Sequence, residues 1–114
     1  MKHIGIVGTG AWATTLGILL ARTGHETVLW SRTEARAVEL IRARINERSV
    51  PGVQFPASMS VSASIDECFS ESQLVIVAVP SVSVRQNVRD LSDALSSVAN
   101  IRIWEGQSRR RDLT

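Results

Sequence analysis

The chain has 114 residues, of which 44% are hydrophobic, and this predicts one small domain with a buried core. Its formal net charge is only +2, because residues 1–101 carry nine basic and nine acidic residues and residues 102–114 carry four arginines and two acidic residues. This balance excludes a basic domain face for nucleic acid, and the lack of any apolar run near ~20 residues excludes a membrane-spanning helix.

A strand, a glycine turn and a helix follow one another at the start of the chain. Residues 2–7 read as a buried strand, so we expect no signal peptide ahead of it. Residues 11–23 have the apolar spacing of a helix. Between them, Gly8 suits a tight turn, Gly10 lacks a Cβ that would keep a ligand from the backbone, and Ala13 allows close helix packing.

This Gly-x-Gly-x-x-Ala pattern, placed between a strand and a helix, is typical of a dinucleotide-binding fingerprint. The unpaired N–H groups of the helix's first turn, together with its dipole, would face the pyrophosphate. The alternative is a glycine-rich turn that holds no ligand.

The second predicted strand, residues 26–30, ends at a basic residue where an acidic one is common. In NAD-specific sites an acidic residue at this place bonds the ribose 2′-hydroxyl. Arg32 stands in that region instead, and a guanidinium suits a 2′-phosphate or an adenine face. We therefore expect NADP to be tolerated or preferred; the alternative is an exposed arginine beside a helix start. Thr33 is a suitable N-cap for a helix over 34–47.

The rest of the chain continues this alternation of strands and helices. Ser64 and Glu67 have the spacing of a capping box, and a short helix follows. Cys68 is the only cysteine, which excludes an internal disulfide and indicates a reducing, cytoplasmic compartment; we expect it to be buried. The other predicted elements are a loop over 46–58, strands over 59–62, 74–79 and 98–103, and a helix over 82–95.

Strands that alternate with helices through short connections predict an α/β fold: a Rossmann-type, doubly wound parallel sheet in the order 3-2-1-4-5. Ligands of such sheets bind at the carboxyl ends of the strands, where the strand order reverses. The Gly8–Ala13 turn and the stretch Val79-Pro80-Ser81 would face each other across that crevice.

Four passages of the sequence resemble the amino-terminal, NAD-binding domain of NAD(P)-dependent glycerol-3-phosphate dehydrogenase. They are Gly8-Thr9-Gly10-Ala11-Trp12-Ala13-Thr14, Leu29-Trp30-Ser31-Arg32, Asn46-Glu47-Arg48-Ser49-Val50-Pro51-Gly52-Val53 and Val77-Ala78-Val79-Pro80-Ser81. The resemblance implies NAD or NADP as cofactor and reversible hydride transfer to dihydroxyacetone phosphate. It also implies cofactor contacts from Gly8, Thr9, Gly10, Ala11, Trp12, Ala13, Arg32 and Thr33, with Val79, Pro80 and Ser81 near the nicotinamide end.

The chain departs from the family pattern in three places. Ala13 replaces a glycine, Ser49 replaces a loop tyrosine, and Ile103-Trp104-Glu105-Gly106 stands where the family has a Lys-Gly pair. The only lysine is Lys2, at the opposite end of the first strand, so we assign no catalytic residue and expect the isolated chain to be inactive.

We therefore expect a domain over residues 1–101 followed by an atypical basic tail over 102–114. A frameshift is one hypothesis for this tail: if Glu105 is encoded by GAA, reading one base later restores Gly-Lys, whereas a GAG codon rules the idea out. The truncated sheet would expose an apolar edge, so self-association is expected. Two other functions remain open, a stand-alone nucleotide-binding or regulatory module and a 6-phosphogluconate-dehydrogenase-like reductase whose substrate domain is elsewhere.

Overall fold

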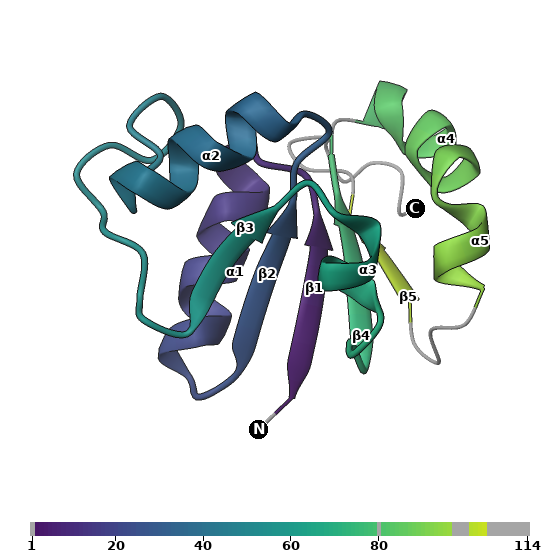
Figure 1. Cartoon of the computed structure of the whole chain (residues 1–114), viewed down its shortest axis with the longest axis horizontal. Coiled ribbons are helices and arrows are strands. Elements are labelled where there is room, and N and C mark those ends of the chain that lie inside the picture. Colours follow the sequence, from purple (N-terminus) through teal and green to yellow (C-terminus); the bar gives the residue numbers. More distant parts are fainter. Residues whose placement is uncertain (1, 80, 97–100, 105–114) are drawn as a thin grey trace, which may run out of the picture.

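The computed structural model describes residues 2–79, 81–96 and 101–104, which form strands and helices in alternation (Figure 1). The strands are β1 (His3–Val7), β2 (Glu26–Trp30), β3 (Met59–Ser62), β4 (Leu74–Ala78) and β5 (Ile101–Trp104). The helices are α1 (Ala11–Arg22), α2 (Glu34–Ala43), α3 (Ile65–Phe69), α4 (Ser81–Asp90) and α5 (Ser92–Leu95).

The strands form one parallel sheet in the order β3-β2-β1-β4-β5, which confirms the predicted doubly wound topology. Val7 at the end of β1 is in register with Trp30 on β2 and with Val77 on β4. The carboxyl ends of these three strands therefore lie side by side. This is the edge at which parallel α/β sheets bind their ligands.

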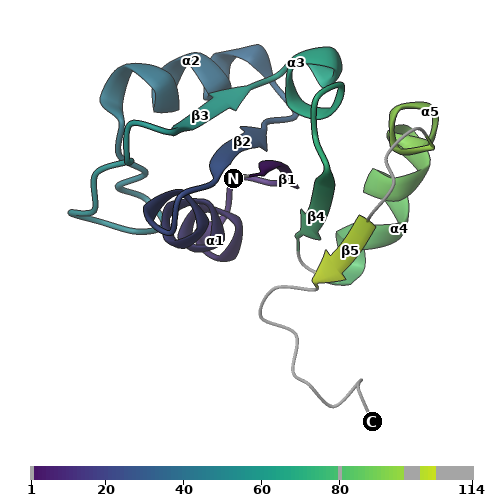
Figure 2. The same ribbon diagram turned by 90° about the horizontal axis from the view of Figure 1, so that it is seen from below.

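The helices divide the core between the two faces of the sheet (Figure 2). One core cluster, on the face that α1 covers, contains alternate strand residues, among them Ile6 and Leu29, which are fully buried, and it also includes residues of α2. On the other face, α3, α4 and α5 cover Val7, Trp30 and Val77. This alternation of sides along each strand follows from the two-residue period of an extended chain.

Helix caps were read correctly from the sequence, with one exception. The Thr33 hydroxyl accepts from the Arg36 N–H at 3.3 Å, and the Ser64 hydroxyl accepts from the Glu67 N–H at 3.2 Å. The capping box also predicts a second bond, from the Ser64 N–H to the Glu67 carboxylate, and this prediction is wrong. The Glu67 carboxylate instead accepts from the Ser62 hydroxyl at 2.6 Å. Ser62 Oγ also accepts from the Ser64 N–H at 3.0 Å. The Ser64 N–H and the Glu67 carboxylate are therefore both bonded to Ser62, at the end of β3, and not to each other.

Two predicted helices have different bounds in the structure. The helix over 34–47 ends at Ala43, because Arg44 adopts a left-handed φ of 57° and donates to the Pro56 carbonyl at 2.7 Å. The helix over 82–95 is divided into α4 and α5 at Leu91, which leaves helical geometry with φ −106° and ψ 12°. Of the strand predicted over 98–103, residues 98–100 lie outside the described residues, and β5 runs on to Trp104.

Cys68 is buried as expected, with its thiol 3.5 Å from the Ser62 carbonyl. Burial raises the pKa of the Cys68 thiol from 9.0 to about 12, with a smaller contribution from the nearby Glu67 charge. The thiol is therefore protonated at neutral pH and acts as a small apolar side chain in the core. No helix among the described residues is long and apolar enough to cross a bilayer.

Candidate functional site

Gly8 closes the turn after β1 in a conformation that other residues rarely adopt. Its φ is +125°, and a Cβ built there would lie 2.6 Å from the Ala78 carbonyl oxygen and 3.2 Å from Val79 Cγ1. The Gly8 N–H donates to the Trp30 carbonyl at 3.1 Å. The turn is therefore packed between the ends of β2 and β4, and only a residue without a side chain fits there.

Gly10, two residues later, faces open space. It is the N-cap of α1 with an ordinary φ of −78°, and a Cβ at this position would meet nothing within 4 Å. The first turn of α1 holds no acidic residue, and Gly10 has no side chain to cap its N–H groups. The amides of Ala11, Trp12 and Ala13 precede the first intrahelical bond, from Thr14 N–H to the Gly10 carbonyl at 3.0 Å. The positive end of a helix dipole is an anion site, and here no side chain caps it.

The remaining residues of the turn lie around this helix start. Ala13 is fully buried against the sheet, as a small residue at the third position of the fingerprint should be. Trp12 is half-buried and packs against the core cluster of α1. The Thr9 carbonyl is held from outside the turn by a side chain of the loop after α2, to which the sequence assigned no role.

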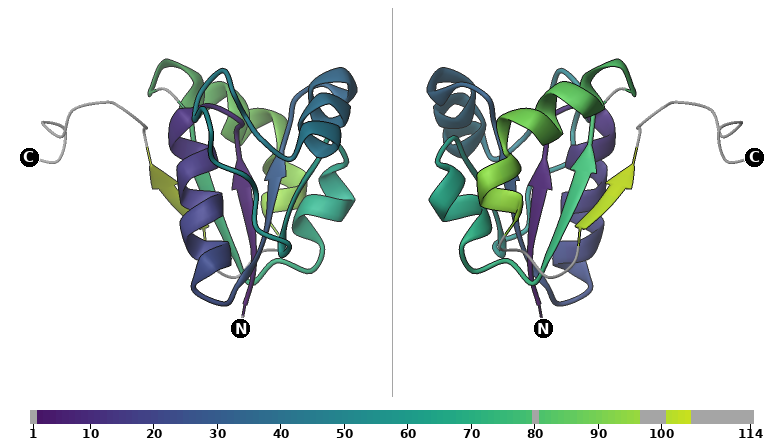
Figure 3. Two further views of the ribbon diagram at one scale, coloured as in Figure 1. Left: turned by 90° about the vertical axis from the view of Figure 1, so that its left-hand side faces the viewer. Right: turned by 90° about the vertical axis from the view of Figure 1, so that its right-hand side faces the viewer.

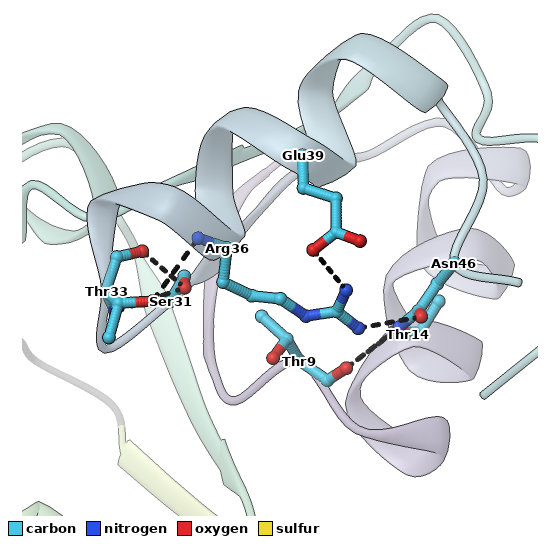
Figure 4. A network of polar contacts seen from close by, with 7 residues as sticks. All are labelled: Thr9, Thr14, Ser31, Thr33, Arg36, Glu39 and Asn46. Atoms are coloured by element: carbon cyan, nitrogen blue, oxygen red, sulfur yellow. Dashed lines mark hydrogen bonds and ion pairs between the residues drawn. The ribbon is translucent and has the colours of Figure 1, made fainter. Parts of the chain in front are cut away.

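That side chain is Asn46, which is 1% exposed and connects three elements (Figure 4). Its Nδ2 donates to the Thr9 carbonyl and to Thr14 Oγ1, each at 2.9 Å. Its Oδ1 accepts from Arg36 Nη2 at 3.0 Å, and Arg36 in turn pairs with Glu39 at 3.0 Å. The polar network therefore fixes the backbone of the glycine turn from α2. One signal for this network is present in the sequence, since Asn46 opens the loop passage that resembles the family.

Arg32 follows β2 as predicted, but its guanidinium lies against α4. Nη2 donates to Asn87 Oδ1 at 2.7 Å, and Nη1 pairs with Asp90 Oδ2 at 3.1 Å. Its Cζ lies 5.5 Å from the centre of the Trp30 ring. Thr33 beside it serves as the N-cap of α2. No pattern in the sequence indicated Asn87 or Asp90, because they are more than fifty residues from Arg32 in the chain.

The residues predicted on the β4 side of the crevice are only partly within the described residues. Val79 is buried in the core cluster of the α4 face and lies next to Gly8. Pro80 lies outside the described residues, and Ser81 begins α4. The structure thus brings the glycine turn, Arg32, Thr33 and Val79 to one edge of the sheet.

A cavity of about 560 Å³ lies elsewhere, beside α3 and the amino ends of β1 and β2. Its lining includes the carboxylates of Glu26, Glu67 and Glu71. These charges would repel the phosphates of a dinucleotide, and no residue of the glycine turn lines the cavity. The candidate site is therefore the turn and not this cavity.

Comparison with known proteins gives a family for this arrangement. Residues 3–106 match the family described as NAD-dependent glycerol-3-phosphate dehydrogenase N-terminus. A glycerol-3-phosphate dehydrogenase [NAD(P)+] of Chlorobium luteolum is 40% identical over 90 residues, which are 79% of this chain and 27% of that protein. One of Halalkalibacterium halodurans is 34% identical over 95 residues, 83% of this chain and 27% of that protein. The chain thus spans about a quarter of the length of these relatives.

Solved structures agree on the fold. The crystal structure of glycerol-3-phosphate dehydrogenase from Coxiella burnetii superposes with a TM-score of 0.82 and 24% identity, over 90% of this chain and 31% of that one. The enzyme from Saccharomyces cerevisiae gives a TM-score of 0.72 with 18% identity, over 90% of this chain and 33% of that one. Together with the family match, these likenesses show that the chain belongs to the NAD-dependent glycerol-3-phosphate dehydrogenase family and corresponds to its amino-terminal, NAD-binding domain.

Proposed function

We propose that the chain binds NAD or NADP with the pyrophosphate at the amino end of α1. The observation that carries the proposal is the contrast between the two glycines of the turn. Gly8 is enclosed by the end of β4, whereas Gly10 is open at the amino end of α1, which no side chain caps. The proposed contacts are Gly8, Thr9, Gly10, Ala11, Trp12 and Ala13 at the pyrophosphate, Arg32 and Thr33 at the adenosine, and Val79, Pro80 and Ser81 at the nicotinamide.

We propose further that the whole protein interconverts dihydroxyacetone phosphate and glycerol 3-phosphate, as the names of the relatives suggest. The nicotinamide cofactor supplies the hydride chemistry, and this domain contributes its binding and orientation. Lys2 is the only lysine of the sequence, and it precedes β1, at the far end of the sheet from the candidate site. We therefore assign no catalytic residue to this chain.

Calorimetric titration of the chain with NADH and with NADPH tests the proposal. We expect saturable binding of at least one dinucleotide and competition between the two. A turnover assay with dihydroxyacetone phosphate should show no activity from this chain alone. The arginines of the described site, Arg32 and Arg36, each pair with a carboxylate, so no cation of that site is left to bind the substrate phosphate. Absence of binding to both dinucleotides would refute the proposal, and measurable turnover would refute the assignment of no catalytic residue.

We also propose that the chain associates with a second copy through the β5 edge. Among the described residues, β5 pairs only with β4, so the outer side of this strand presents its backbone groups to a partner (Figures 2 and 3). Open strand edges are templates for pairing with another chain. Light scattering at increasing protein concentration should show a rising mean mass; a constant monomer mass at high concentration would contradict the proposal.

The cytoplasmic location inferred from the single cysteine remains a proposal as well.

A further inference from the structure

From the position of Asp90 on α4 we infer that this residue determines which dinucleotide the site prefers. The inference rests on the dinucleotide binding proposed above. Asp90 pairs with Arg32 at 3.1 Å, although the two are 58 residues apart in the sequence. In the right-hand view of Figure 3, α4 runs obliquely across the sheet, and this path carries its second half toward the end of β2.

The direction of the Arg32 guanidinium is fixed by more than a surface ion pair. Asn87, one turn before Asp90 on α4, is 7% exposed and accepts from Arg32 Nη2 at 2.7 Å. The guanidinium also lies over the ring of Trp30, which is itself buried in the core. An isolated exposed ion pair has little tendency to hold one geometry, but here two acceptors on one helix face and an aromatic ring define it.

The sequence has no acidic residue at the end of β2, but the fold brings the carboxylate of Asp90, on α4, to Arg32 at that place. An acidic side chain at this place accepts a bond from a ribose 2′-hydroxyl but repels a 2′-phosphate. Arg32 alone would attract that phosphate, and Asp90 opposes the attraction by neutralising the guanidinium. The pair therefore favours NADH relative to NADPH, compared with the same site without the Asp90 charge.

The test compares dissociation constants of NADH and NADPH for the full chain and for Asp90→Asn. The amide keeps the size of the side chain and an oxygen that can accept from Arg32. Besides the charge it removes the second acceptor of Asp90, to which Gln86 Nε2 donates at 2.7 Å, and rotation of the exposed Gln86 amide restores that bond with the direction reversed. We expect the affinity for NADPH to rise by about tenfold, as for the loss of one charge repulsion near a protein surface, while that for NADH changes little.

Glu39→Gln is the matched control. Glu39 is the carboxylate paired with the other arginine near the site, Arg36, at 3.0 Å. If Arg32 and Asp90 decide the preference, this control leaves the ratio of the two dissociation constants unchanged. A shift in Glu39→Gln without one in Asp90→Asn would overturn the inference and assign the preference to Arg36.

The outcomes separate this inference from the proposed function. Binding of neither dinucleotide refutes dinucleotide binding and, with it, the role of Asp90. Binding of both with an unchanged ratio in Asp90→Asn refutes the role of Asp90 alone. Should Asp90→Asn not fold, Asp90→Ser removes the same charge and is judged by the same ratio.

Discussion

Gly8→Ala is expected to destabilise the domain more than any other substitution at the candidate site. The new Cβ would lie 2.6 Å from the Ala78 carbonyl oxygen, in a backbone with φ +125°. The unfavourable φ alone costs about 1–3 kcal/mol, and the contact with the end of β4 adds to it because that carbonyl belongs to the sheet. We expect the unfolding midpoint to fall by about 10 °C or more, measured by circular dichroism on heating.

Gly10→Ala is the matched control for this substitution, and it separates folding from binding. A methyl group at Gly10 meets no atom within 4 Å, and φ is −78°, so the free energy of unfolding should fall by no more than about 1 kcal/mol from the poorer N-cap. The same methyl group would occupy the approach to the helix amides and weaken dinucleotide binding by about tenfold or more. Equal loss of stability in both variants would contradict the assigned difference between the glycines.

Asn46→Ala should have the second largest effect, on stability and binding together. The substitution leaves the Thr9 carbonyl, Thr14 Oγ1 and the Arg36 guanidinium each without one hydrogen bond, at a residue only 1% exposed. Buried polar groups that lose a partner cost about 1–3 kcal/mol, so we expect a loss of about 2–4 kcal/mol in urea unfolding. The dissociation constant for the dinucleotide should rise as well, because Thr9 belongs to the turn that holds it.

Two further variants make the Asn46 prediction specific. Arg48→Ala changes an exposed residue of the same loop and should leave both measurements unchanged. Asp at position 46 retains an acceptor for Arg36 but cannot donate to the Thr9 carbonyl. If Asn46→Asp binds the dinucleotide as well as the unchanged chain, the bond to Thr9 does not position the turn.

The fold could be predicted from the sequence because its signals are local. The apolar runs of β1 and β4, the helical spacing after the glycine turn, and the caps Thr33 and Ser64 each depend on neighbours within a few residues. The strand order then follows from the right-handed crossovers that such short connections allow. The end of α2 was predicted four residues too late, because the bridge between Ile45 and Gln54 and the burial of Asn46 depend on contacts that no helical pattern contains.

The glycine turn, the basic residue after β2 and the parallel sheet that brings them to one edge could all be predicted from the order of the residues. The contacts of these residues depend on the packed domain: Asn46 at the Thr9 carbonyl, and Asn87 and Asp90 at Arg32. Backbone conformation depends on adjacent residues, so a sequence pattern can reveal it. Pairing of side chains across a crossover depends on how α4 and the loop after α2 pack on the sheet, and that packing is fixed only when the whole core is assembled.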